Sequence, residues 1–284
     1  MVRVGLIGRG IQLSRTPFMH ETEGRRQGLD YSYCLIDLDE PEHAATNAAQ
    51  ALASVENQGF AGVNVTFPFK QSIMEHVHDV SEAAQAVGAA NTIVFRKGRR
   101  IGHNTDVTGF DSGFRRCMKG RRLETVLLLG AGGAGGAVAH ALLEYGVGTL
   151  LILDTLPDQA TALTERLRSR FGGKARVQTV EQLEDIAGSL DGIVNATPVG
   201  MAKSPGCPFP KHLLSGRIWV ADVIYFPLET ELLAAARKAG CLTMSGAEMA
   251  IFQAAHAFEL FTGLQADSIA MRASFDAYDD VAGS

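Results

Sequence analysis

Cysteine is scarce in this chain of 284 residues, and the few cysteines lie far apart. The four are Cys34, Cys117, Cys207 and Cys241, and no two of them form a CxxC pair. In a chain long enough to bury its own core, this spacing indicates reduced thiols rather than a disulfide framework. The run Met1–Ile7 is too short for a secretory signal, and no small-residue cleavage site follows it. We therefore expect a cytoplasmic protein.

Basic residues are not in excess either. The 26 Lys and Arg against 31 Asp and Glu give a formal net charge of −5, which argues against nucleic acid or an anionic membrane as a general partner. One stretch without Lys, Arg, Asp or Glu runs from Thr125 to Leu143 and has to be weighed as a membrane span. Five of its 19 residues are glycines, clustered at 130–136. A strand, a tight turn and a buried helix explain this stretch directly, so no membrane span is expected.

Glycine is the residue present in surplus, at 31 of 284, against a usual share of about 7%. These glycines follow no three-residue period, which excludes collagen. A hydrophobic content of 46% with mixed charge argues against disorder. The length suggests two domains, at about 150 residues for each.

The first part of the chain alternates apolar, strand-like segments with helical ones. We expect the helix over residues 16–27 to open with Thr16 as N-cap and Pro17 at the first helical position. Strands that alternate with helices predict a mostly parallel sheet with right-handed crossovers, followed here by a hairpin. The predicted strands are 2–7, 31–36, 62–66, 92–96 and one near Ile101, and the further predicted helices are 41–58, 69–77 and 81–87.

A second unit is predicted to begin near Asp106. Its pattern again alternates buried strands with helices, and long helices end the chain. The predicted strands are 125–129, 149–153, 193–195 and 219–223, and the predicted helices are 106–118, 133–145, 159–171, 247–263 and 267–278.

The segment Gly130-Ala131-Gly132-Gly133-Ala134-Gly135 fits the dinucleotide-binding pattern G-x-G-x-x-G. A predicted strand precedes it and a predicted helix follows it, which is the context that the pattern needs. Gly130 would allow the tight turn, Gly132 would let the backbone approach a pyrophosphate, and Gly135 would let the helix pack against the strand. The pyrophosphate would lie at the helix N-terminus, where free N–H groups and the dipole favour negative charge. The alternative is a turn that binds nothing.

Asp154 follows the next predicted strand, 24 residues after Gly130. A carboxylate here can accept hydrogen bonds from both hydroxyls of the adenosine ribose, and it would repel a 2′-phosphate. Residues 155–158 include no arginine that could bind such a phosphate. The chain is therefore predicted to prefer NAD to NADP. The alternative is that Asp154 only caps a turn before Pro157.

Four further segments carry unusual polar residues: 14–17, 64–70, 88–92 and 102–106. Taken singly, each has a plain structural explanation, since Thr16 and Asp106 are good helix caps and a lysine is more often a solvated charge. Taken together, they favour a ligand site. Asn64 and Thr66 lie at the end of a predicted strand, where ligands bind in open α/β sheets. Lys70 would lie in the first turn of a helix, where the dipole disfavours a cation, and Asp106 at the seam between the predicted domains.

These segments resemble the shikimate dehydrogenase family, and the resemblance spans nearly the whole chain. The family motifs are S-x-S/T, N-V-T-x-P-x-K, G-A-x-N-T, N-T-D, G-A-G-G-A, N-A-T-P-x-G-M, D-x-x-Y-x-P, and G-x-x-M followed by Gln. In this chain they stand, in order, at Ser14–Thr16, Asn64–Lys70, Gly88–Thr92, Asn104–Asp106, Gly130–Ala134, Asn195–Met201, Asp222–Pro227, and Gly246–Met249 with Gln253. The resemblance implies an α/β fold of two domains. Residues 1–104 plus 247–284 would form a mostly parallel substrate-binding and catalytic domain, and residues 105–246 a Rossmann NAD-binding domain.

The resemblance also implies roles for single residues. Lys70 and Asp106 would be the catalytic pair at the hydroxyl that is oxidised, with Lys70 as base or as proton relay. Ser14 and Thr16 would hold the substrate carboxylate, and Asn64 is a further substrate-binding candidate. The other ring hydroxyls would meet Thr66, Asn91 and Gln253, Tyr225 would line the substrate site, and Ala196, Thr197, Val223, Gly246 and Met249 would lie near the ribose and nicotinamide of the cofactor.

Departures from the common shikimate-specific pattern point to one branch of the family. Members that use NADP have Asn-Arg-Thr or Asn-Arg-Ser after the second Rossmann strand, where this chain has Leu153-Asp154-Thr155. They usually have Ser at the position of Thr16 and Gly at that of Val107. These differences resemble the NAD-dependent quinate/shikimate branch. That branch implies reversible oxidation of a ring hydroxyl of quinate or shikimate to 3-dehydroquinate or 3-dehydroshikimate, in quinate catabolism or in the shikimate pathway of aromatic amino acid biosynthesis.

Several alternatives stay open. Within the family, the alternatives are a strictly shikimate-specific dehydrogenase and an aminoshikimate-type dehydrogenase. A protein that is not an enzyme is a further alternative, namely a non-catalytic ligand sensor on the same fold. We expect NAD as cofactor, with NADP as the disfavoured alternative, a monomer or a homodimer, and no nucleic-acid partner. His76 and His78 have no carboxylate or cysteine cluster beside them, so no metal is expected.

Overall fold

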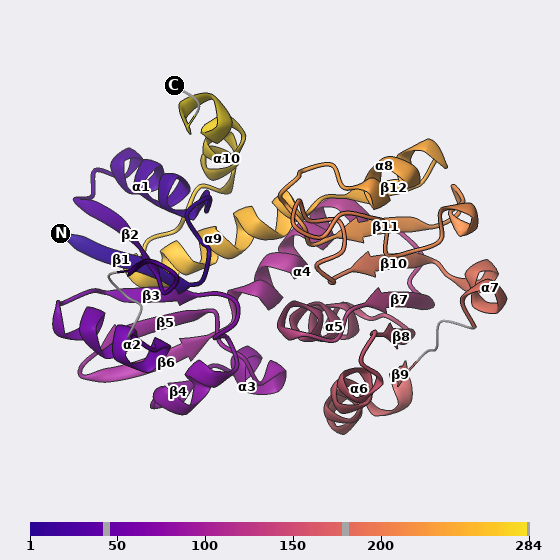
Figure 1. The fold of residues 1–284 in the computed structure, drawn as a ribbon, viewed down its shortest axis with the longest axis horizontal. Helices are drawn as coiled ribbons and strands as arrows, with labels where there is room; N and C mark the ends of the chain where they lie inside the picture. Colours follow the sequence, from indigo (N-terminus) through magenta and orange to yellow (C-terminus); the bar gives the residue numbers. More distant parts are fainter. Residues whose placement is uncertain (42–45, 178–181, 283–284) are drawn as a thin grey trace. The chain divides into compact units, whose positions relative to one another are not determined.

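The computed structural model describes residues 1–41, 46–177 and 182–282, and the chain divides into two compact units. Unit 1 comprises Met1–Thr105 and Ile251–Ser284, and unit 2 comprises Asp106–Ala250. Each unit contains a six-stranded sheet covered by helices (Figure 1). The predicted α/β fold with two domains is confirmed, whereas the functional limits proposed for those domains stay a prediction.

The sheet of unit 1 is mixed, with the strand order β2-β1-β3-β5-β6-β4. Strand β1 pairs in parallel with β2 and β3, and β4 with β6, whereas β5 runs antiparallel to β3 and β6. The predicted hairpin is therefore the antiparallel part of a mostly parallel sheet. The strands are β1 (Val2–Gly8), β2 (Tyr31–Asp37), β3 (Gly62–Val65), β4 (Asp79–Val80), β5 (Thr92–Arg96) and β6 (Arg99–His103).

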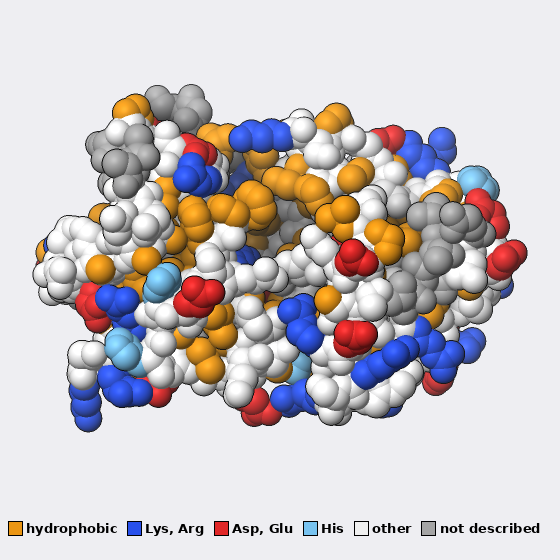
Figure 2. All heavy atoms as spheres, turned by 60° about the horizontal axis from the view of Figure 1, so that its bottom comes forward, with side chains coloured by type: hydrophobic (Ala, Val, Ile, Leu, Met, Phe, Trp, Pro, Cys, Tyr) orange, Lys and Arg blue, Asp and Glu red, His pale blue; other side chains and the backbone are white. Residues whose placement is uncertain are grey.

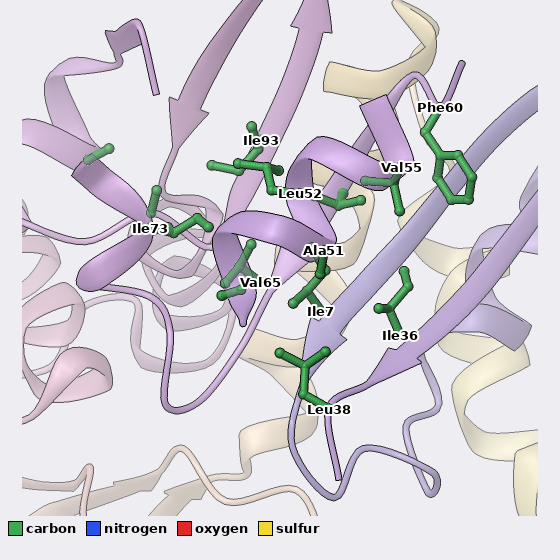
Figure 3. Close-up of a cluster of buried hydrophobic side chains, with 14 residues drawn as sticks. Ile7, Ile36, Leu38, Ala51, Leu52, Val55, Phe60, Val65, Ile73 and Ile93 are labelled. Carbon is green, nitrogen blue, oxygen red and sulfur yellow. The ribbon is translucent and has the colours of Figure 1, made fainter. Parts of the chain in front are cut away.

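Side-chain alternation along the strands gives unit 1 a core on each face of its sheet. On one face, Ile7 and Ile93 pack with Leu52 of α2 (Figure 3). On the other face, Val4 packs with Phe261 of α9. The helices of this unit are α1 (Thr16–Arg26), α2 (Ala48–Asn57), the 3₁₀ helix η2 (Ser72–His76), α3 (Glu82–Val87), most of α9 (Gly246–Thr262), and α10 (Ser268–Ala282).

Unit 2 has a parallel sheet with the strand order of a Rossmann fold. The order is β12-β11-β10-β7-β8-β9, and each pair of neighbours is parallel. The chain reverses direction across the sheet between β7 and β10, which is the switch point where ligands bind in such folds. The elements are α4 (Thr105–Met118), β7 (Thr125–Leu129), α5 (Gly133–Tyr145), β8 (Thr149–Leu153), α6 (Pro157–Phe171), β9 (Ala175–Val177), α7 (Leu183–Ile186), β10 (Gly192–Asn195), β11 (Trp219–Asp222), α8 (Glu231–Lys238) and β12 (Leu242–Met244).

Helices bury both faces of this second sheet. Leu127 of β7 packs in one cluster with Leu232 of α8. The ring of Phe114 in α4 lies 5.0 Å from that of Trp219 in β11. Burial on two faces explains why β7 reads as an uninterrupted apolar run, which can be mistaken for the start of a membrane span. Within the described residues, no helix is both long enough and apolar enough to cross a bilayer.

The predicted N-cap of one helix and the predicted start of another are wrong. Helix α1 begins at Thr16 itself, its N-cap is Arg15, and no side chain caps it. Helix α2 begins at Ala48 instead of residue 41, because Asn47 and Gln50 form a capping box there. Residues 42–45 of the predicted helix lie outside the described residues.

The α-helix predicted over residues 69–77 is also wrong. Lys70 lies in a turn that leads into the five-residue 3₁₀ helix η2. Lys70 therefore does not lie in the first turn of an α-helix, and the dipole argument made for it from the sequence has no basis in the fold.

Charged side chains of both signs are interspersed on the face of the molecule shown in Figure 2. Exposed ion pairs of the chain include Arg99 with Asp79 at 2.6 Å and Arg170 with Glu144 at 2.8 Å. Among the residues that the structure describes, no group of three or more His, Cys, Asp or Glu is placed to hold a metal ion.

Candidate functional site

Polar side chains of unit 1 gather where β1 and β3 end and β5 begins. Parallel pairing sets Ile7 of β1 opposite Val65 of β3, and antiparallel pairing sets Asn64 opposite Thr92 of β5. These three strand ends therefore share one edge of the sheet. We call this the polar edge, and its predicted substrate and catalytic residues are Ser14, Thr16, Asn64, Thr66, Lys70 and Asn91.

Asn64 is buried at the polar edge, with 5% of its surface exposed. Its Oδ1 accepts a hydrogen bond from the Tyr33 hydroxyl at 2.8 Å, and its Nδ2 donates to Thr92 Oγ1 at 2.9 Å. The amide therefore joins β3 to β2 and β5. Because these bonds occupy its polar atoms, the structure gives Asn64 a role in ordering its neighbours, and its direct contact with a substrate stays a prediction.

Asn91 is the second buried amide of the polar edge. Its Oδ1 accepts from the backbone N–H of Thr105 at 2.7 Å, and its Nδ2 donates to Thr105 Oγ1 at 3.0 Å. Thr105 Oγ1 in turn donates to Gln253 Oε1 at 3.5 Å. Asn91 and Gln253, far apart in sequence, thus belong to one network. Its bonds also fix the backbone immediately before Asp106, which is itself 5% exposed.

Thr66 and Lys70 bound a tight turn after β3. The backbone N–H of Thr66 donates to the carbonyl of Ile7, and its carbonyl accepts from the N–H of Phe69, each at 2.9 Å. The Lys70 carbonyl accepts from the N–H of Ala90 at 2.8 Å, in the segment before β5. These bonds fix the backbone that carries the half-buried side chains of Thr66 and Lys70.

Ser14 and Thr16 lie where the loop after β1 enters α1. Ser14 Oγ accepts from the N–H of Thr16 at 3.3 Å. Asp37 at the end of β2 holds the loop, because its Oδ1 accepts from Gly10 N–H and its Oδ2 from Ile11 N–H, each at 2.9 Å. Burial opposes ionisation of Asp37, but its N–H donors together outweigh burial and lower the pKa of the carboxyl group.

Arg15, between these two hydroxyl residues, is 4% exposed and points into the protein. Its Nη1 donates to the backbone carbonyl of Phe275 in α10 at 2.9 Å. Its guanidinium also lies 4.7 Å from the centre of the Phe275 ring. The C-terminal helix therefore anchors the start of α1. Sequence reasoning missed the positioning contacts of Arg15 and Asp37, because the partners lie far away in the chain.

The glycine-rich loop of unit 2 lies at the switch point between β7 and β10. Gly130 has φ +97°, and a Cβ there would come within 2.8 Å of the Ala196 carbonyl oxygen. A Cβ at Gly135 would lie 2.1 Å from the carbonyl oxygen of Gly130. At Gly132 and Gly133 a Cβ would meet no described atom within 4 Å, and no side chain caps α5. The helix N-terminus thus offers its N–H groups, with Ala134 in its first turn, to an anion.

Asp154 lies beside this loop. Its Oδ2 accepts from the N–H of Ala131 at 2.7 Å, and its Oδ1 accepts from the N–H of Leu156 at 2.8 Å. The second bond is the turn cap that the sequence allowed as an alternative, and the first places the carboxylate against the glycine loop. An ionised carboxylate has about four acceptor positions, so these two bonds are compatible with further bonds to ribose hydroxyls.

The remaining predicted cofactor residues of unit 2 lie on neighbouring loops. Ala196 and Thr197 follow β10, and their backbone atoms approach Gly130. Val223 follows β11, and a Cβ at Gly246 would lie 2.3 Å from the Val223 carbonyl oxygen. The loop after β10 therefore packs closely on the glycine loop, and the loop after β11 packs closely on the start of α9.

Two predicted residues lie beside these loops with different exposure. Met249 is 7% exposed in the first turn of α9, and Tyr225 is 38% exposed in the loop after β11. A bound ligand can reach the Tyr225 side chain more readily than that of Met249.

Asp222 ends β11 and is a further polar residue of this region. Burial raises its pKa to about 6, although hydrogen bonds from Ile224 N–H, Thr230 and Asn195 lower it. The sequence motifs include Asp222 and Asn195, but sequence reasoning assigned neither a role. Both residues are polar and lie at the ends of predicted strands, and this pattern could have indicated from the sequence that they have a role.

Comparison with known proteins gives consistent matches along the chain. Residues 6–93 match the family model described as the shikimate dehydrogenase substrate binding domain. The chain is 49% identical over 271 residues to shikimate dehydrogenase (NADP(+)) of Streptomyces avermitilis, covering 95% of this chain and 93% of that protein. It is 43% identical over 277 residues to quinate/shikimate dehydrogenase (NAD(+)) of Corynebacterium efficiens, covering 96% and 97%.

A solved structure is similarly close. Quinate dehydrogenase from Corynebacterium glutamicum in complex with NAD matches with a TM-score of 0.93 and 42% identity, over 97% of this chain and 99% of that one. The similarity therefore extends over both units.

Proposed function

The chain belongs to the shikimate dehydrogenase family, and on that premise we propose that it reversibly oxidises a ring hydroxyl of quinate or shikimate with NAD. The observation that carries the proposal is that one chain has both a polar edge in unit 1 and a Rossmann glycine loop in unit 2. The polar edge offers hydroxyl, amide and ammonium groups to a polyhydroxylated acid. The glycine loop offers backbone N–H groups to a dinucleotide.

Oxidation of a secondary alcohol needs one acceptor for the hydroxyl proton and one for the hydride. NAD, when bound, accepts the hydride. Lys70 and Asp106 are the proposed catalytic pair at the reacting hydroxyl. Lys70 takes its proton as base or passes it on as a relay, and the Asp106 carboxylate orients the hydroxyl and the lysine.

The other residues of the polar edge are proposed to bind the rest of the substrate. The hydroxyls of Ser14 and Thr16 donate hydrogen bonds to its carboxylate. Thr66, Asn91 and Gln253 bind the remaining ring hydroxyls, Asn64 supports them from within the sheet, and Tyr225 lines the substrate site. Such a set discriminates by hydrogen bonding, since a substrate that lacks one hydroxyl leaves a buried polar partner unpaired.

NAD rather than NADP is proposed as the cofactor because of Asp154. Its carboxylate already lies against the glycine loop, where a 2′-phosphate would meet like charge. Relatives of both kinds exist, since the Streptomyces avermitilis protein is named for NADP(+) and the Corynebacterium efficiens protein for NAD(+). The preference therefore depends on residues such as Asp154.

The test of this function is the formation of reduced cofactor when purified protein is mixed with NAD and either acid. We expect turnover with quinate and with shikimate. Turnover with shikimate alone would select the strictly shikimate-specific alternative. Tight calorimetric binding of either acid without any turnover would contradict the proposal and indicate a ligand sensor.

A further inference from the structure

We propose that Asp222 is a positioning residue for the cofactor, because it holds the loops after β10 and β11 in one fixed arrangement. This inference rests on the proposed function, in which those loops bind the dinucleotide. Asp222 and Asn195 are the last residues of their strands and lie directly opposite each other. Asp222 is 1% exposed and Asn195 is 0% exposed, so both act through the residues that they hold.

The carboxylate of Asp222 accepts hydrogen bonds from three directions. Its Oδ1 accepts from Asn195 Nδ2 at 3.1 Å and from the N–H of Ile224 at 2.9 Å. Its Oδ2 accepts from Thr230 Oγ1 at 2.8 Å. Thr230 also caps α8 by accepting from the N–H of Leu233 at 3.3 Å. One carboxylate therefore joins β10, the loop after β11 and the start of α8.

The first arm of this network runs through Asn195 to the glycine loop. Asn195 Oδ1 accepts from the N–H of Thr197 at 3.0 Å and from its Oγ1 at 2.7 Å. Asn195 Nδ2 also donates to the carbonyl of Val199 at 3.1 Å. Thr197 and Ala196 pack so closely on Gly130 that no side chain fits there. A shift of Asn195 would therefore also move the turn at Gly130, which is proposed to face the pyrophosphate.

The second arm runs through Ile224 to α9. The N–H of Gly246 donates to the Ile224 carbonyl at 3.2 Å, and the missing side chain of Gly246 leaves room for the Val223 carbonyl. Val223, Gly246 and Met249 are the residues proposed to meet the ribose and nicotinamide. Asp222 is thus connected by hydrogen bonds to both groups of proposed cofactor residues, those of the loop after β10 and those of the loop after β11 with the start of α9.

The hydrogen-bond pattern predicts which replacement of Asp222 preserves its role. Two N–H donors point at Oδ1, whereas Oδ2 accepts from the Thr230 hydroxyl alone among the residues that the structure describes. In Asp222→Asn the amide oxygen can take the place of Oδ1, and the amide nitrogen can donate to Thr230 Oγ1, which is an acceptor as well as a donor. Asp222→Ala leaves Ile224 N–H and Thr230 without this acceptor. The pKa raised by burial agrees with a site that accommodates an uncharged group.

The test measures calorimetric NAD affinity together with KM and kcat for Asp222→Ala and Asp222→Asn. We expect Asp222→Ala to weaken NAD binding about tenfold or more, with KM for quinate within about threefold of wild type, since most substrate residues lie in unit 1. Asp222→Asn should restore NAD affinity to within about threefold. Val220→Ala, in the buried middle of the same strand, is the matched control that lowers stability without touching the network.

Two results would overturn the proposal: unchanged NAD affinity in Asp222→Ala, or an equal loss in Val220→Ala. If Asp222→Ala does not fold, Asn195→Ala removes the first arm and leaves the bonds of Asp222 to Ile224 and Thr230, and wild-type NAD affinity in that variant would also contradict the proposal. Failure of the proposed function looks different. A wild-type protein that binds NAD without turning over either acid refutes the function, and the affinities of the variants still decide the role of Asp222.

Discussion

Three aspartates occupy similar places at the ends of strands. Asp37 ends β2, Asp154 follows β8 and Asp222 ends β11. Each accepts hydrogen bonds from a loop that carries predicted ligand-binding residues or leads to them. Backbone N–H groups lose their ladder partners where a strand ends, and a carboxylate is a strong substitute acceptor. A single side chain therefore sets the conformation of each loop.

The first prediction at the residue scale concerns Lys70. Lys70→Ala should lower kcat by about 10²- to 10⁴-fold, because it removes the proposed proton acceptor. Calorimetric affinity for NAD should remain unchanged. Lys238→Ala, at an exposed position in the last turn of α8, is the control and should turn over like wild type. Near-normal turnover of Lys70→Ala would remove Lys70 from the mechanism.

The second prediction distinguishes Asp37 from Asp222. Both oxygens of Asp37 face N–H donors, including Asp39 N–H on Oδ1 and Gln12 Nε2 on Oδ2. An amide nitrogen cannot accept these bonds, so Asp37→Asn should raise KM for quinate about tenfold and leave KM for NAD unchanged. Asp39→Asn, which loses only an exposed ion pair with Arg9, is the control. Wild-type kinetics in Asp37→Asn would show that this carboxylate does not position Ser14 and Thr16.

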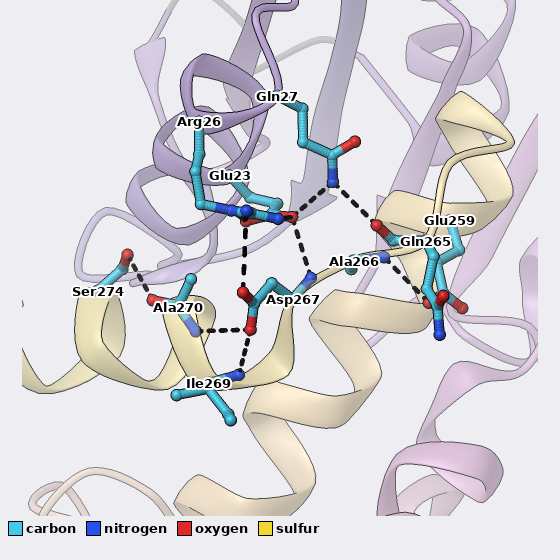
Figure 4. A network of polar contacts seen from close by, with 10 residues as sticks. All are labelled: Glu23, Arg26, Gln27, Glu259, Gln265, Ala266, Asp267, Ile269, Ala270 and Ser274. Atoms are coloured by element: carbon cyan, nitrogen blue, oxygen red, sulfur yellow. Dashed lines mark hydrogen bonds and ion pairs between the residues drawn. The ribbon is translucent and has the colours of Figure 1, made fainter.

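At the scale of elements, α1 depends on α10 for its position. Glu23 of α1 is 1% exposed and accepts from Arg26 Nε at 2.8 Å, Gln27 Nε2 at 2.6 Å and the N–H of Asp267 at 3.0 Å (Figure 4). Asp267 directly precedes α10 and caps it through the N–H of Ala270. Together with the bond from Arg15 to Phe275, this network holds the helix that starts at Thr16.

The pH dependence of stability tests the packing of α1 against its neighbours. His20 is 0% exposed, its Nδ1 lies 2.9 Å from the Tyr31 hydroxyl, and its ring lies 4.9 Å from that of Tyr33. Burial lowers the pKa of His20 to about 3, against a smaller opposite effect of Glu23. The unfolded chain binds a proton below about pH 6.5 and the folded chain does not, so stability falls as the pH drops.

Between pH 7 and pH 5, His20 should therefore cost the folded protein about 2 kcal/mol. Hydrogen exchange of the β2 amides, corrected for intrinsic rates, measures this loss in unit 1. Over the same interval, His20→Phe should lose about 2 kcal/mol less stability than wild type. Comparing the two proteins cancels the contributions of the other titrating groups. Parallel losses in wild type and His20→Phe would contradict the assignment.

Elements with a strong local pattern could be predicted from the sequence, and elements that depend on context could not. The strand, glycine turn and helix of residues 125–145 follow from local apolar runs and glycine spacing. The start of α2 was missed although Asn47 and Gln50 have the spacing of a capping box. Strands β9 and β12, of three residues each, were not predicted, because pairing with a neighbouring strand defines such short segments.

At the scale of the whole molecule, the two units carry different parts of the proposed reaction. Unit 1 provides the polar edge for a hydroxylated acid, and unit 2 provides the Rossmann loops for the dinucleotide. The sequence predicted these two sets of residues through their motifs. It did not predict what holds them in place, since the bonds from Asp37 to its loop and from Asp222 to Asn195 span 26 or 27 residues.

The central claim is that the chain oxidises quinate or shikimate and uses NAD to do so. The most direct test is kcat/KM for both acids with both NAD and NADP, measured on the wild-type protein. We predict turnover of both acids and a preference for NAD of about tenfold or more, because the Asp154 carboxylate would face the 2′-phosphate of NADP. A higher kcat/KM with NADP would contradict the role of Asp154, and no turnover with any pair would contradict the function itself.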